Sequence, residues 1–216
     1  MTPGAAVTDL EIWRLLEEAA AWRLLGLLFE RPRGGWWREV GGLRREVSDP
    51  GVGAAADAGQ GEGDEGTYLA VLGPGGPVSP REVTYRGMED PGRILADVEA
   101  FYAAFAFRPQ TEEAPDHLAV EAGFLGYLCL KEAYARARGE AEAAETAAQA
   151  ATHFREAHLS AFAWPVRDRL EGTGVRYLSL AAAALARRTA PPREGAMAPG
   201  DLPQGCTACP PGCEPG

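Results

Sequence analysis

The spacing of apolar residues is the feature of this chain that most restricts its fold. Trp13, Leu16, Ala20, Leu24 and Leu27 follow one another at steps of three or four residues, which places them on one face of a helix. Similar stripes recur further along the chain. No stretch keeps up the alternation of apolar and polar residues that is typical of a half-buried strand. The sequence therefore predicts an all-α fold.

Capping residues and prolines mark the ends of the expected helices. The capping-box pattern from Thr8 to Glu11 begins the first helix, and Arg31-Pro32 ends it. Asp90-Pro91 and Pro115-Asp116 are read as further helix starts. Aspartate is a common capping residue, and proline is favoured in the first turn of a helix. The expected later helices are 36 onward, 90 to 108, 115 to 139, 140 to 164 and 175 to 188, with a short apolar turn at 68–72.

Composition predicts one domain with two less ordered parts. The 216 residues are 46% hydrophobic and 24% charged, as in ordinary globular proteins. Residues 49–66 contain almost no large apolar side chain, so we expect a mobile loop there. Residues 189–216 are rich in proline and glycine, so we expect a disordered tail after a helical domain over residues 1–188.

The charge and the lack of long apolar runs restrict location and partners. A net charge of −10 repels nucleic-acid phosphates and permits a basic peptide partner, although solubility alone accounts for such a charge. No run reaches the roughly 18 to 20 apolar residues that cross a bilayer, and the first nine residues lack the basic start of a signal peptide. We therefore expect a cytoplasmic protein without membrane insertion.

The tail carries Cys206, Cys209 and Cys213 in a CxxC-type arrangement. This spacing lets two thiolates reach one metal ion, but three cysteines leave a tetrahedral site one ligand short. We predict no cofactor. The cysteines remain a weak candidate for a metal or redox site.

Two neighbouring motifs resemble one known family. The segment from Phe101 to Phe107 is rich in aromatic residues, and Glu113-Ala-Pro115-Asp116-His117-Leu118 follows it. Together with weaker matches at 80–85 and at 154–159, which includes His158, these motifs resemble the TorD/DmsD family over about residues 68–180. Members of that family are cytoplasmic chaperones that hold the twin-arginine signal peptide of an unfolded molybdenum enzyme until its cofactor is inserted. The resemblance implies a single-domain helical bundle whose N- and C-terminal halves join near residues 108–116.

The resemblance also implies a recognition site for the signal peptide, at Asp116, His117 and, less directly, Glu121. A ligand with two arginines before an apolar stretch needs carboxylates at the mouth of an apolar groove. The structural alternatives are that Asp116 only caps a helix and that the aromatic residues are core, with the two tyrosines as the expected exceptions. The candidate residues are Tyr85, Tyr102, Phe105, Glu113, Pro115, Asp116, His117 and Glu121, with Glu112 and Phe124 nearby.

The leading hypothesis is a chaperone and not an enzyme. Its partner would be the apo catalytic subunit of a molybdoenzyme, bound through its leader peptide before cofactor insertion and export, and the chaperone would be a monomer or an exchange dimer. The alternative is a metal- or redox-handling accessory protein that uses the cysteine tail. A hydrolase is disfavoured, because consecutive helical residues such as Asp116 and His117 diverge by about 100° and no third residue orients the histidine.

Overall fold

The computed structural model describes residues 9–189, which form helices and connecting segments without a β-strand. The predicted all-α fold is therefore confirmed. In chain order the elements are α1 (Asp9–Leu28), α2 (Trp36–Arg44), α3 (Pro50–Glu62), α4 (Glu65–Leu72), the 3-10 turn η1 (Glu82–Tyr85), α5 (Pro91–Ala104), α6 (Leu118–Ala137), α7 (Ala141–Phe154), the π-helical turn η2 (Arg155–Leu159), α8 (Ser160–Glu171) and α9 (Arg176–Arg188).

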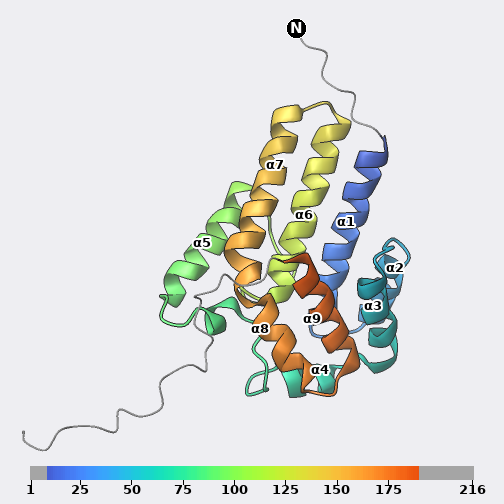
Figure 1. Cartoon of the computed structure of the whole chain (residues 1–216), viewed down its shortest axis with the longest axis vertical. Coiled ribbons are helices and arrows are strands. Elements are labelled where there is room, and N and C mark those ends of the chain that lie inside the picture. The colour runs from blue at the N-terminus through green and yellow to red at the C-terminus, as the bar shows by residue number, and fades with distance from the viewer. Residues whose placement is uncertain (1–8, 190–216) are drawn as a thin grey trace, which may run out of the picture.

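α1 and α6 run antiparallel along each other at the centre of the bundle, with α7 on the other side of α6 (Figure 1). Two glycines allow the close approach of α1 and α6. A Cβ atom on Gly26 would lie 2.8 Å from the carbonyl oxygen of Ala119, and one on Gly126 would lie 3.0 Å from that of Ala19. Because α1 belongs to the N-terminal half and α6 to the C-terminal half, this packing joins both halves in one core.

The prediction of a mobile loop over residues 49–66 is wrong, because α3 occupies most of that segment. The Asp49 side chain accepts hydrogen bonds from the backbone N–H groups of Gly51 and Val52, and Pro50 stands in the first turn, so the helix start is well capped.

The small residues of α3 allow the helix to pack closely against its neighbours. A Cβ atom on Gly59 would meet Leu28 at 3.1 Å, Trp36 at 3.3 Å and Tyr177 at 3.5 Å, so large side chains of the neighbouring elements fill the space. α3 packs mainly on α9, and the partners supply the apolar bulk that the segment itself lacks.

Other element boundaries also differ from the prediction. The expected turn at 68–72 is the second half of α4, and the helix expected to end near Pro165 continues through that proline in α8. A π-helical turn, η2, interrupts the α-helical hydrogen bonding between α7 and α8. The Ser160 hydroxyl donates to the Arg155 carbonyl there at 2.9 Å. The final predicted helix is confirmed by α9.

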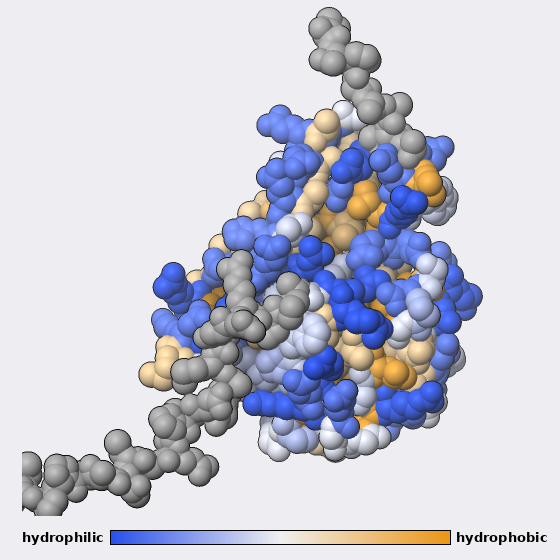
Figure 2. Space-filling view, viewed as in Figure 1, coloured by the Kyte–Doolittle hydropathy of each residue, from blue (hydrophilic) through white to orange (hydrophobic). Residues whose placement is uncertain are grey.

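Hydrophilic residues dominate the surface seen in Figure 2, with apolar residues in separate small areas. Within residues 9–189, no helix has both the length and the apolar character needed to span a membrane. The predicted tail lies, apart from Thr189, outside the described residues, and so do its three cysteines and the Thr8 cap.

Candidate functional site

The segment before η1 lies beside the segment that begins α6. The Glu82 backbone N–H donates to the Asp116 carbonyl at 3.0 Å, and the Leu118 N–H donates to the Pro80 carbonyl at 2.9 Å. Arg81 and His117 form an isolated antiparallel bridge between these two bonds. The contact brings the two sequence motifs of residues 80–85 and 113–118 together.

Asp116 is fully buried and does not cap α6. Its carboxylate accepts hydrogen bonds from Nε of Arg81 and, at 3.2 Å, from the backbone N–H of Val83. The capping prediction for Asp116 is wrong by one residue. His117 is the N-cap, and its Nδ1 accepts from the Ala119 N–H at 3.1 Å.

His117 is buried and neutral. Burial, with a smaller contribution from the positive charge of Arg81, lowers the pKa of His117 to about 3. Since Nδ1 acts as an acceptor, the hydrogen-bond pattern assigns the proton to Nε2. Nε2 lies 3.3 Å from the Tyr68 hydroxyl and 3.7 Å from Oε2 of Glu113.

A second buried cluster surrounds Glu82. Nε of Arg86 donates to its Oε1 at 2.6 Å, and Nδ1 of His158 lies 3.0 Å from its Oε2. Glu121 is fully buried beside this cluster. Burial and the nearby carboxylates of Glu82 and Asp116 raise the pKa of Glu121 well above its usual value, which favours the protonated carboxyl group.

The two tyrosines expected to line an apolar groove lie in the core. Tyr102 donates its hydroxyl to the Pro115 carbonyl, and Tyr85 donates to the Ser79 carbonyl, both at 2.8 Å. Both hydroxyl groups are thus hydrogen-bonded, but the rings are buried, and the centroid of the Tyr102 ring lies 4.8 Å from that of Phe124. The core alternative therefore holds for these aromatic residues. Phe105 and Pro115 remain partly exposed.

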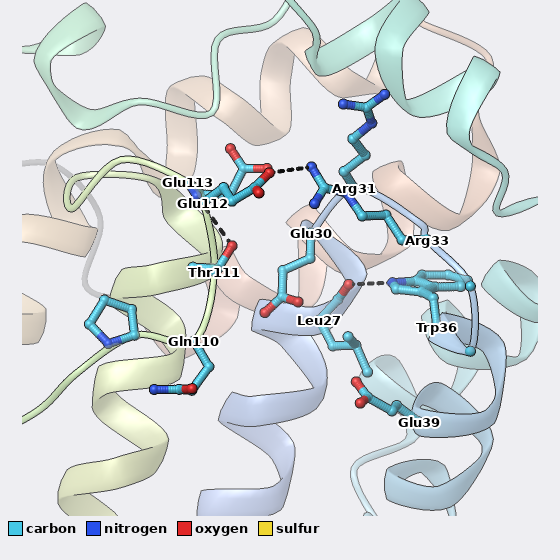
Figure 3. A pocket seen from close by; sticks show the side chains of 13 residues that line it. Leu27, Glu30, Arg31, Arg33, Trp36, Glu39, Gln110, Thr111, Glu112 and Glu113 are labelled. Atoms are coloured by element: carbon cyan, nitrogen blue, oxygen red, sulfur yellow. Dashed lines mark hydrogen bonds and ion pairs between the residues drawn. The ribbon is translucent and has the colours of Figure 1, made fainter.

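An open cleft of about 580 Å³ lies between the α1–α2 connection, residues 29–35, and the middle of the α5–α6 connection, residues 109–113 (Figure 3). Leu27 and Trp36 are among its lining residues, although both are buried, and the Trp36 Nε1–H donates to the Leu27 carbonyl at 2.8 Å. The charged groups that line the cleft are four carboxylates and two guanidinium groups: Glu30, Glu39, Glu112, Glu113, Arg31 and Arg33.

Glu113 lies between the cleft and the buried His117. It lines the cleft, and its carboxylate also approaches the His117 ring. Burial raises the pKa of Glu113 above its usual value. Glu113 is the one member of the predicted site that lines this cleft.

Sequence reasoning missed the cleft and the buried partners of the predicted residues. The available signals are the Arg31-Pro32-Arg33-Gly34-Gly35 run between two helices and the Pro80-Arg81-Glu82 stretch. His158, which lies in the weaker match at 154–159, is fully buried and paired with Glu82. Within residues 9–189, no group of three or more His, Cys, Asp or Glu side chains is arranged to hold a metal ion.

Comparison with known proteins identifies the family. The family model described as nitrate reductase delta subunit matches residues 65–166. The chain is similar to the chlorate reductase assembly chaperone protein of Ideonella dechloratans and to the selenate reductase assembly chaperone protein of Thauera selenatis. Each is 32% identical over 165 residues, which cover 74% of this chain and 79% of the relative. No solved structure matches the chain significantly. The chain belongs to the TorD/DmsD family of redox-enzyme maturation chaperones.

Proposed function

We propose that this protein is the assembly chaperone of a molybdenum-cofactor oxidoreductase. It binds the apo catalytic subunit through the twin-arginine leader peptide and assists cofactor insertion in the cytoplasm, before export. The similarity to the chlorate and selenate reductase assembly chaperones supports the class of client. The acidic cleft between residues 29–35 and 109–113 is the observation that carries the choice of ligand.

The cleft suits a segment that contains arginine. Four carboxylates against two guanidinium groups line the cleft and leave an excess of negative charge. Guanidinium groups bind carboxylates through paired, charge-assisted hydrogen bonds, which favours arginine over other basic residues. A volume of about 580 Å³ lies within the range of peptide and small-ligand sites.

The buried residues of the predicted site act indirectly in this proposal. Asp116 and Glu121 are fully buried, so direct contact with a leader arginine would require the segments around them to separate. His117 instead holds the start of α6 and lies against Glu113, which faces the cleft. Asp116 and His117 therefore position Glu113, and Glu113 meets the ligand.

Titration calorimetry with a synthetic twin-arginine leader peptide tests the proposal. Glu113→Gln should weaken binding about tenfold, because a charge-assisted hydrogen bond is lost while the side-chain shape is kept. Glu142→Gln removes the same charge from the exposed surface of α7 and should bind like the wild type. A peptide with both arginines replaced by glutamine should bind more weakly to the wild type.

Salt dependence gives a second test of the same contact. Attraction between arginine and carboxylate is screened over about 8 to 10 Å at moderate ionic strength, so binding should weaken as salt is added. Equal affinity of Glu113→Gln and wild type, together with salt-independent binding, would remove the cleft from the recognition site.

A further inference from the structure

The carboxylates of the cleft already face cationic groups of the protein itself. Glu112 pairs with Arg33, whose Nη2 lies 2.9 Å from Oε2 of the glutamate. Arg23, beside the cleft, lies 2.6 Å from Glu30 and 3.8 Å from Glu39. Guanidinium groups of the protein thus lie on the same kind of carboxylate that an arginine-bearing ligand would use.

The Arg33–Glu112 ion pair differs from the others in its position. Arg33 stands on the α1–α2 connection and Glu112 on the α5–α6 connection, so the pair joins the two sides of the cleft (Figure 3). Both side chains are well exposed, at 53% and 81% of their surface. An exposed pair of this kind contributes little to stability and exchanges easily with another partner.

The other arginines around the cleft are held in ways that tie them to the fold. Arg31 pairs with Glu65 of α4. Arg23 pairs with Glu30, whose side chain is only 23% exposed, so this pair is less accessible to a ligand. Arg33 is therefore the guanidinium that a ligand can replace most easily.

We propose that Arg33 is an internal competitor for the ligand's arginine: its guanidinium occupies Glu112 in the free protein and is displaced when the leader peptide binds. This inference rests on the proposed function. A ligand arginine that meets Glu112 replaces an ion pair that already exists, so this contact adds less to affinity than the contact with Glu113. Arg33 and Arg31 act on the Glu113 carboxylate only through longer-range attraction, and its neighbour in the salt-bridge range is the neutral His117 ring.

The test measures binding of the twin-arginine leader peptide to the whole protein by titration calorimetry. Arg33→Gln should bind the peptide about two- to fivefold more tightly, the range expected when an exposed ion pair no longer has to be broken. Arg38→Gln is the matched control. It removes the same charge from α2, where the guanidinium lies 4.9 Å from the Trp37 ring and does not line the cleft. The control should bind like the wild type.

A double-mutant cycle separates competition from a general effect of charge. In a Glu112→Gln background Arg33 has lost its ion-pair partner and keeps only longer-range attraction to Glu113 and Glu65, so Arg33→Gln should add little to the affinity. A gain that persists in that background, or an equal gain in Arg38→Gln, would overturn the role of Arg33 as a competitor. Circular dichroism and thermal melts on each variant verify that the fold is unchanged.

The outcomes also distinguish this inference from the proposed function. If the wild type binds the peptide and Glu113→Gln weakens binding, but Arg33→Gln leaves the affinity unchanged or weaker, only the competitor role is lost. If the wild type does not bind the peptide, both ideas are lost together.

Discussion

Nδ1 of His158 lies 3.0 Å from Oε2 of Glu82, a contact between two fully buried side chains that are 76 residues apart in the chain. The same glutamate holds Arg86, whose guanidinium also donates to the Ala157 carbonyl. The contact therefore fastens η1 to the π-helical turn before α8. It keeps the segment of residues 79–86 against the start of α6, next to the residues that position Glu113.

Removal of the Glu82 carboxylate should destabilise the fold. Glu82→Ala leaves His158 and the largely buried Arg86 without their shared partner, so we expect the free energy of unfolding to fall by about 3 kcal/mol. Urea denaturation measures this. Glu89→Ala removes an exposed carboxylate that lies 3.6 Å from the same arginine, and it should change stability by less than about 0.5 kcal/mol. Similar losses of unfolding free energy in the two variants would show that the buried Glu82 carboxylate stabilises the fold no more than the exposed Glu89 does.

The α1–α6 contact predicts opposite effects of two glycine substitutions. Gly26→Ala would place a Cβ atom 2.8 Å from the Ala119 carbonyl oxygen, a backbone atom with little freedom to move, so we expect a loss of about 1 to 3 kcal/mol. Gly123→Ala, three residues from Gly126 in α6, meets no atom within 4 Å and should gain up to about 1 kcal/mol from better helix propensity. Thermal melts compare the two. A Gly26→Ala protein as stable as the wild type would contradict the close packing of these helices.

Stability should decrease with rising pH because of Glu121. Its pKa in the folded protein lies well above the usual value of 4.5, so above that pH the unfolded chain releases a proton that the folded protein keeps. Glu121→Gln removes this effect and keeps the shape of the protonated carboxyl group. The variant should therefore gain stability relative to the wild type as the pH rises from 4.5, by at most about 1.4 kcal/mol per pH unit. Urea denaturation at several pH values checks this, and a constant difference would rule out a protonated Glu121.

His117 should have the opposite effect on the acid side. Because its pKa falls from 6.5 to about 3 on folding, the unfolded chain takes up a proton below pH 6.5 that the folded protein does not. The stability that neutral His117 provides is complete above pH 6.5 and is lost as the pH falls toward 3. His117→Asn, which can still cap α6, should flatten this loss between pH 6.5 and 4.5.

The control for His117 is an exposed histidine. His153→Asn removes such a side chain from α7 and should leave the slope of stability against pH as in the wild type. Slopes are compared and not absolute stabilities, because His117→Asn also removes the contact with Tyr68. Equal slopes in all three proteins would show that His117 is protonated in the folded state at acid pH.

The sequence by itself determined the elements whose signals are local. The stripe from Trp13 to Leu27 predicted α1, Asp90-Pro91 predicted the start of α5, and the apolar residues after Val175 predicted α9. Helix periodicity and capping depend on residues at most four positions apart, so one sequence contains the information. The motif of residues 113–118 also placed the chain in its family without any knowledge of the fold.

Only the tertiary structure decided what depends on distant partners. α3 is ordered because Trp36 and Tyr177 supply the bulk that its small residues lack. Asp116 accepts from Arg81 instead of capping a helix, since a segment 35 residues earlier in the chain lies beside it. The cleft arises where two connections, residues 29–35 and 109–113, come together. The burial and pairing of charged groups depend on which surfaces meet in space, and no local pattern in the sequence specifies that.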